Sequence, residues 1–119
     1  MDDERIWTFE TSLWTGDTDD YRQSIDDACL MVLPTSPFIM VGSTAIEAVS
    51  KTPRWTQITL SQRNVSRPQD GLIVVAYFAE TSIGEDEKYS ACCSSTYLRR
   101  GHDNWTVIQH QQTPPLATS

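Results

Sequence analysis

Basic residues are scarce in this chain of 119 residues. It has 9 lysines and arginines against 16 aspartates and glutamates, which gives a net charge of −7. A nucleic-acid-binding protein needs a cationic face that neutralises phosphates. The charge balance therefore argues against nucleic acid as a partner.

Long hydrophobic runs are also absent, since no stretch approaches the ~20 apolar residues that span a bilayer. The first ten residues, MDDERIWTFE, carry acids where a secretory signal needs basic and apolar residues. We therefore expect a cytoplasmic protein without a membrane partner. Its length fits a single domain over 1–119 with a core of its own. Residues 1–2 and 114–119 are expected to be loose ends.

Cysteine, histidine and glycine are few, with 3, 2 and 5 copies. An odd number of cysteines argues against a disulfide framework. Cys92 and Cys93 are adjacent, and on a strand their side chains would point to opposite faces, away from a shared metal ion. There is no zinc-like ligand spacing and no glycine-rich phosphate loop. The sequence predicts no metal and no cofactor.

Helix patterns occupy the first part of the chain. Ile6, Phe9 and Leu13 have the spacing of a helix stripe, which predicts a helix over 3–15 that Gly16 ends. A second short helix is expected over 17–25, where Tyr21 would be buried.

A third helix is expected over 44–52. The segment TAIE has the form of a capping box, in which Thr44 caps the helix and Glu47 reaches back to it. Pro53 would end this helix.

The rest of the sequence has the patterns of strands. A first strand is expected at 27–34, and four more at 55–68, 72–81, 89–100 and 105–113. Turn-separated strands of this length predict an antiparallel meander, and helices gathered on one side of it make an α+β domain. Because long strands twist and curl, we expect a cone-shaped half-barrel. In it, three N-terminal helices pack on a strongly curved antiparallel sheet and enclose a cavity.

Three segments, 14–32, 42–49 and 94–115, resemble the nuclear transport factor 2-like superfamily. They match its Gly-Asp and Asp-Asp-Ala segment, its Gly-x-x-Ala-Ile helix start and the closing hairpin of its association-domain-like branch. The superfamily includes ketosteroid isomerase, the SnoaL-like polyketide cyclases and the association domain of calmodulin-dependent kinase. The resemblance spans essentially the whole chain and implies the same cone-shaped fold.

The resemblance also places the catalytic positions of the isomerases. The tyrosine of the oxyanion hole falls near Phe9, the aspartate base near Val32 and the protonated acid near Ser95. Phenylalanine donates no hydrogen bond and valine accepts no proton. The isomerase residues are therefore not retained, which favours a non-catalytic protein.

His110 is the best candidate for the acid–base chemistry of the cyclase-like and dehydratase-like members. Asp26, Asp27, Tyr77 and Ser95 are candidates for an orienting partner. Three roles stay open for His110: an acid or base in the pocket, a non-catalytic polar group of the pocket, or a structural residue at a dimer interface.

Strand alternation predicts which face each residue of the last strand occupies. Thr106, Ile108, His110 and Gln112 would share one face, which the resemblance suggests is the concave one. Trp105 and Val107 would lie on the outer face, where an apolar patch calls for a partner. We therefore expect a homodimer formed through the sheet.

The interior of the cone is where a small apolar or aromatic ligand would bind. The residues expected to line it are Phe9, Leu13, Tyr21, Val32, Met40, Trp55, Val75, Tyr77, Cys93, Ser95, Tyr97, Ile108 and His110. The leading interpretation is a non-catalytic small-molecule-binding or association domain with this pocket. The alternative is a small hydratase, cyclase or isomerase that uses His110 as acid or base.

Overall fold

The computed structural model describes residues 1–16, 19, 23, 25–34, 36–49, 55–85 and 87–116. The helices are α1 (Asp3–Thr15) and α3 (Gly42–Val49), and the strands are β1 (Ile25–Val32), β2 (Ile39–Val41), β3 (Gln57–Gln69), β4 (Leu72–Ile83), β5 (Glu87–Gly101) and β6 (Asn104–Thr113). The described part thus has two helices where three were expected. The helix expected over 17–25 falls mostly outside the described residues, and Ile25 already belongs to β1. Neither described helix is long and apolar enough to cross a bilayer.

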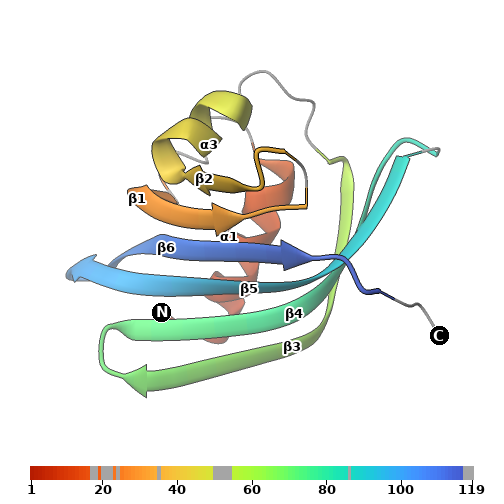
Figure 1. Ribbon diagram of the computed structural model, residues 1–119. Helices are drawn as coiled ribbons and strands as arrows, with labels where there is room; N and C mark the ends of the chain where they lie inside the picture. Colours follow the sequence, from red (N-terminus) through yellow and green to blue (C-terminus); the bar gives the residue numbers. More distant parts are fainter. Residues whose placement is uncertain are drawn as a thin grey trace.

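All six strands form one sheet, in the order β2-β1-β6-β5-β4-β3. The sheet bends strongly toward the end where β4 turns into β5, and it does not close, because β2 and β3 remain at opposite edges (Figure 1). β3 to β6 form the expected antiparallel meander. The expectation of a purely antiparallel sheet is wrong, however, because β1 pairs with β6 in parallel. Two strands that are neighbours in the sheet but not consecutive in sequence can run in the same direction. A meander pattern shows only the pairing of consecutive strands, so it cannot predict such a pair.

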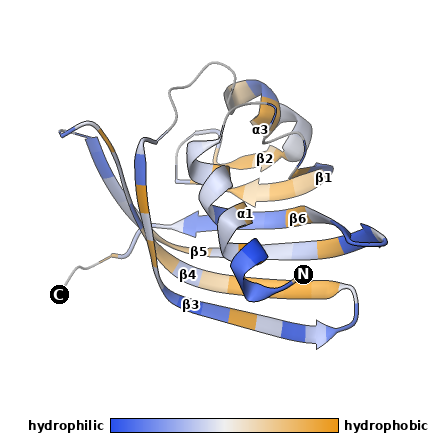
Figure 2. Ribbon diagram, turned by 180° about the vertical axis from the view of Figure 1, so that it is seen from behind, coloured by the Kyte–Doolittle hydropathy of each residue, from blue (hydrophilic) through white to orange (hydrophobic). Residues whose placement is uncertain are grey.

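α1 lies across the concave face of the sheet (Figures 1 and 2). Asp2 caps it by accepting a hydrogen bond from the Arg5 backbone N–H at 2.8 Å, and Gly16 forms its C-cap. The helix buries four residues at helical spacing, namely Ile6, Glu10, Leu13 and Trp14. Phe9, which the sequence placed on this stripe, is only half-buried at its margin.

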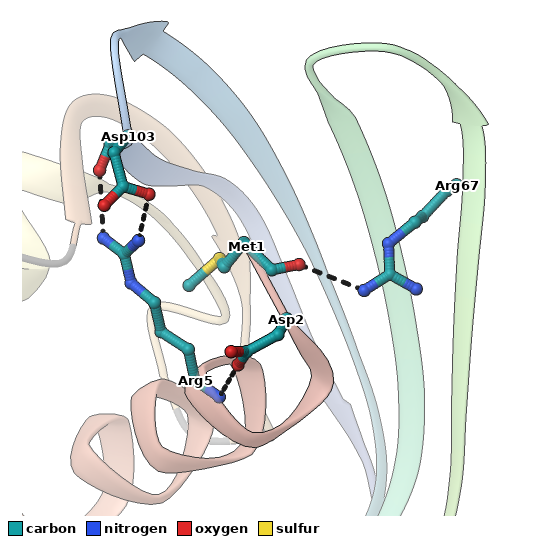
Figure 3. A network of polar contacts seen from close by, with 5 residues as sticks. All are labelled: Met1, Asp2, Arg5, Arg67 and Asp103. Carbon is teal, nitrogen blue, oxygen red and sulfur yellow. Dashed lines mark hydrogen bonds and ion pairs between the residues drawn. The ribbon is translucent and has the colours of Figure 1, made fainter.

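Polar contacts fix the N-terminal end of α1 to the sheet (Figure 3). Arg5 donates to the carboxylate and the carbonyl oxygen of Asp103, in the turn between β5 and β6. Arg67 of β3 donates to the Met1 carbonyl at 3.1 Å and to the Asp3 carboxylate at 2.7 Å. These ion pairs are exposed, so each adds little stability. They nevertheless attach the start of the helix both to β3 and to the turn between β5 and β6.

α3 begins two residues earlier than expected. Because the helix starts at Gly42, Thr44 lies within its first turn and does not serve as the cap. Residues 50–52, where the expected helix would continue, lie outside the described part. Gly42 sits directly against β1: a Cβ built on it would lie 2.2 Å from the Asp26 carbonyl oxygen. The close approach of α3 to β1 therefore requires glycine at this position.

β6 carries a β-bulge at Ile108. The pairing with β5 passes from Tyr97–Val107 directly to Thr96–Gln109, which leaves Ile108 without a residue opposite it. The side chains therefore change faces there, and Trp105, Val107 and His110 are all buried on the concave side. The prediction that Trp105 and Val107 lie on an exposed outer face is wrong. A prediction from the alternation of side chains along a strand assumes that no residue is inserted, so it could not include the bulge.

Candidate functional site

A buried carboxyl group, that of Glu10 on α1, lies at the centre of the concave face. Its side chain is inaccessible to solvent. Two hydroxyl groups of β5 reach it: Tyr97 Oη donates to Oε2, and Ser95 Oγ donates to Oε1 at 2.8 Å. The Tyr77 hydroxyl of β4 is a third hydrogen-bonding neighbour and accepts from Trp14 Nε1 at 3.1 Å. The carboxyl group is thus held by side chains from two strands.

His110 joins this cluster through Ser95. Its Nδ1 lies 2.7 Å from Ser95 Oγ, and its Nε2 lies 3.1 Å from the amide nitrogen of Gln112. In this arrangement the Ser95 hydroxyl donates its hydrogen to Glu10, so its oxygen accepts from His110 and Nδ1 carries the hydrogen. The Gln112 amide nitrogen is a donor only, so Nε2 must accept. Both contacts assign the same neutral tautomer, with its lone pair on Nε2 and directed at Gln112.

Burial favours the neutral form of each ionisable group in this cluster. Removal from water raises the pKa of Glu10, and the hydrogen bonds from Tyr97, Tyr77 and Ser95 offset this only in part. Burial lowers the pKa of His110 to about 4. It also raises the pKa of the Cys93 thiol to about 12, with the Glu10 carboxyl adding to the effect. At neutral pH the cluster therefore holds a neutral imidazole.

Aromatic rings extend from His110 toward the surface. The Trp14 ring meets the His110 ring edge-on, with centroids 6.5 Å apart, and lies 6.1 Å from the ring of Tyr89. Tyr89 in turn stacks on the half-buried Trp55 at 5.9 Å. The Tyr89 hydroxyl is buried and, among the described residues, has no hydrogen-bond partner. Tyr89 also lines a hollow of about 390 Å³ between the curved ends of β3, β4 and β5.

The structure brings most of the expected pocket residues to the concave side. Those buried in the core or in the polar cluster are Leu13, Val75, Tyr77, Cys93, Ser95, Tyr97 and His110. Phe9, Met40 and Trp55 are half-buried, and Tyr21 lies outside the described residues. Phe9 packs edge-on against Tyr97, and Trp55 reaches the cluster through Tyr89.

Two expected pocket residues point elsewhere. Val32 is 40% exposed, and its neighbour Met31 takes the inward position in register with His110. Ile108 sits at the bulge, outside the alternation that buries Val107 and His110. Of the proposed orienting partners, Asp27 is exposed, and Asp26 pairs with Arg100 and the Ala28 backbone N–H. Ser95 is the partner that contacts His110.

Sequence reasoning missed Glu10. The signal was present, because Ile6, Glu10 and Leu13 follow the spacing of the buried helical stripe. An acid on such a stripe is rarely buried without a hydrogen-bonding partner. Because Phe9 was assigned to the buried face of the helix, Glu10 was not considered as a buried residue.

Chemically, the cluster is an acid and a base joined by one hydroxyl group. Glu10 and His110 both contact Ser95 Oγ, so hydrogen bonds link the carboxyl group to the imidazole, whose Nε2 carries the free lone pair. Among the described residues, no three histidine, cysteine, aspartate or glutamate side chains gather as a metal site would require. The geometry therefore suits proton transfer, or the binding of a ligand through hydrogen bonds.

Solved structures of other proteins share this fold. A nuclear transport factor 2-like protein from Rhodospirillum rubrum aligns with a TM-score of 0.79 at 17% identity, over 97% of this chain and 100% of that one. One from Cytophaga hutchinsonii gives 0.78 at 18% identity, over 97% and 100%. The association domain of calmodulin-dependent kinase II from Caenorhabditis elegans gives 0.75 at 14% identity, over 92% and 90%.

Sequence comparison points the same way. No curated protein matches the chain. The family model of the SnoaL-like domain, however, matches residues 7–117, nearly the whole sequence. With the six-stranded curved sheet and the helix across its concave face, this match confirms the resemblance noted in the sequence. The chain belongs to the SnoaL-like domain family.

Proposed function

We propose that this chain is a self-associating domain that pairs with a second copy of itself through the outer face of its sheet. The observation that carries the proposal is an exposed apolar patch on β1 and β2. It consists of two directly opposed cross-strand pairs, Leu30–Val41 and Val32–Ile39. Their exposed fractions are 56%, 44%, 40% and 68%. Directly opposed residues share one face of a sheet, so these four side chains form one surface, called here the β1–β2 patch.

Charge supports a second copy as the partner. Each copy carries a net charge of −7, so two copies repel each other unless their contact surface is uncharged. The β1–β2 patch has no charged member. It continues onto β6 and β5, where Leu30 is in register with Gln109, and Gln109 hydrogen-bonds to Thr96 and Ser94. An apolar patch that continues into neutral polar groups suits a symmetric contact between identical faces.

The β1 and β2 strands are coloured mainly as hydrophobic in Figure 2. Structural neighbours named as association domains, from Caenorhabditis elegans and from Xanthomonas campestris, agree with a role in association. The proposal differs from the sequence-based expectation in its residues. The patch replaces Trp105 and Val107, which are buried within the single chain.

The test is to place a charge in the patch. Val32→Asp and Ile39→Asp are each expected to weaken self-association at least thirtyfold, because burying an unpaired carboxylate at the centre of an interface costs about 2 kcal/mol or more. Sedimentation equilibrium measures the dissociation constant. Leu116→Asp is the matched control, since Leu116 is fully exposed outside the patch, and it should leave association unchanged. A wild-type chain that stays monomeric at high micromolar concentration overturns the proposal.

A second candidate is a small hydratase, cyclase or isomerase that uses His110 as its acid or base. The observation that favours it is the hydrogen-bonded series Glu10–Ser95–His110, which supplies both a proton donor and a proton acceptor. If it is correct, some member of a panel of ketones, lactones and hydrated polyketides is converted, and His110→Gln lowers the rate by about 10²-fold or more.

The pH dependence of such a reaction follows from the burial of His110. Because its pKa is lowered to about 4, the basic imidazole is present at every pH above that value. The rate should therefore rise with a midpoint near 4 and stay level toward neutrality. His102→Gln, in the exposed turn between β5 and β6, is the control and should change nothing. Absence of turnover across the panel leaves the self-associating domain as the function.

A further inference from the structure

Phe38 lies in the connection between β1 and β2 and exposes a large apolar ring. Its side chain is 54% exposed, and that of the next residue, Ile39, is 68% exposed. The Phe38 carbonyl oxygen accepts a hydrogen bond from the Leu33 backbone N–H at 2.7 Å, which ties the two ends of the connection together. Phe38 therefore stands beside the β1–β2 patch, at the end formed by the pair Val32–Ile39.

The backbone of Phe38 has an unfavourable conformation. Its φ is +71°, in the left-handed region that residues with a bulky side chain rarely adopt. Among the described residues, the other non-glycine residues with positive φ are Gln62 and Asp103, which are both polar. A glycine at position 38 would adopt this backbone without the cost. Strain of this kind is concentrated at functional positions, so an exposed phenylalanine held in it calls for a role.

The left-handed backbone accounts for two exposed apolar residues in succession. Along a regular strand neighbouring side chains alternate between the two faces of the sheet. A residue with positive φ interrupts this alternation, and both Phe38 and Ile39 face solvent. The strained conformation thus adds an aromatic ring to the end of an apolar surface.

The outer face of the sheet that continues from this end is uncharged. Residues in register on neighbouring strands share one face. One such row crosses all six strands, through Ile39, Val32, Gln111, Ser94, Ala76 and Asn64. None of these side chains is charged, and none is buried within the chain. A second copy, which also carries a net charge of −7, can cover this row without bringing like charges together.

We propose that Phe38 is the anchor residue of the contact between two copies, and that its left-handed backbone holds the ring against the uncharged outer face of the second copy. The inference rests on the proposed function, because it names the residue that determines the strength of self-association. Aromatic residues are enriched at the centre of interfaces, where a few residues carry most of the binding energy. The four aliphatic residues of the β1–β2 patch surround the anchor and exclude water from it.

Three substitutions at position 38 separate the ring from the backbone. Phe38→Ala and Phe38→Gly both remove the ring, and each should weaken self-association by the same factor, at least about tenfold. Phe38→Tyr keeps the ring and should associate as the wild type does. Sedimentation equilibrium measures the three dissociation constants.

Urea denaturation of the same variants tests the backbone. Glycine normally makes a chain less stable than alanine does, but at a left-handed position only glycine is free of strain. Phe38→Gly should therefore unfold at a higher urea concentration than Phe38→Ala. Because the two variants associate equally, their difference in stability does not contain a contribution from the contact between copies.

Gln62→Gly is the matched control. Gln62 has a φ of +51° and is exposed on β3, at the edge of the sheet opposite β2, so the substitution relieves a similar backbone and should leave self-association unchanged. If Phe38→Ala associates as the wild type does while Val32→Asp does not, the role of Phe38 is overturned and the proposed function stands. A wild-type chain that stays monomeric overturns both. A Phe38→Ala variant at least as stable as Phe38→Gly overturns the strained anchor.

Discussion

Replacing Glu10 with glutamine is expected to stabilise the protein at alkaline pH and to remove most of the loss of stability that the wild type shows as pH rises. The carboxyl group has an unfolded-state pKa of 4.5, and burial raises it in the folded state. A group whose pKa is raised on folding contributes stability fully below 4.5, and this contribution is lost as pH rises through the folded value. Glutamine has a similar shape and cannot ionise. Its amide oxygen can accept from one of the Tyr97 and Ser95 hydroxyl groups, while its amide nitrogen donates to the oxygen of the other.

His110 produces the opposite dependence on the acid side. Its pKa is lowered from 6.5 to about 4, so its contribution is present above 6.5 and is lost as pH falls through 4. Glu10→Gln should leave the fall in unfolding free energy at acid pH unchanged. Above pH 4.5 it should make the unfolding free energy nearly independent of pH. The other titratable groups facing the carboxyl, Tyr77, Tyr97 and Cys93, have raised pKa values and stay neutral through this range.

Urea denaturation at a series of pH values measures the effect. Glu10→Ala serves as a second variant and should destabilise at all pH values, since each buried hydroxyl left without a partner costs about 1–3 kcal/mol. Glu4→Gln on the exposed side of the same helix is the control for a change in net charge. If Glu10→Gln and Glu4→Gln have the same pH profile, burial does not raise the pKa of the Glu10 carboxyl as described above.

Gly42→Ala is expected to destabilise the protein strongly, although it adds only one methyl group. The new Cβ would lie 2.2 Å from the Asp26 carbonyl oxygen and 3.2 Å from both Cys29 Cβ and Ile25 Cγ2. All three atoms belong to β1, which lies between β2 and β6 in the sheet. Because a backbone oxygen cannot rotate away, α3 must move off the strand, which costs about 3 kcal/mol or more.

Thermal unfolding checks this expectation. Gly101→Ala is the matched control, because a Cβ at Gly101 meets no atom within 4 Å and the residue has no positive φ. It should change stability by no more than about 0.5 kcal/mol. Equal melting temperatures for the two variants contradict the close packing of α3 on β1.

The strands were the most predictable part of this fold. Alternating apolar residues and turn sequences placed β4 at 72–81, where the structure has Leu72–Ile83, and β6 at 105–113, where it has Asn104–Thr113. These are local signals, carried by neighbouring residues. The parallel pairing of β1 with β6 is a relation between segments some eighty residues apart, and no local pattern encodes it.

In the candidate site, too, features set by local sequence could be predicted and features set by contacts between distant segments could not. Ser95 and His110 could be named from the sequence because their residue types and strand positions fit the site. The β-bulge at Ile108 could not, since it depends on how β6 fits against β5. It left the position of His110 as expected while moving Trp105 and Val107 to the inner face. Glu10 was overlooked because the helical stripe was read through Phe9 rather than one residue later.

The place of β6 in the sheet also affects the order in which the protein is assembled. β6 is the last strand in sequence, yet it lies between β1 and β5 and joins the β2–β1 pair to the β5–β4–β3 meander. During synthesis these two parts leave the ribosome before the strand that connects them. Until residues 104–113 emerge, both β1 and β5 present unpaired backbone groups, each open to mispairing with another nascent chain. The emergence of β6 is therefore the step that protects these two strands from aggregation.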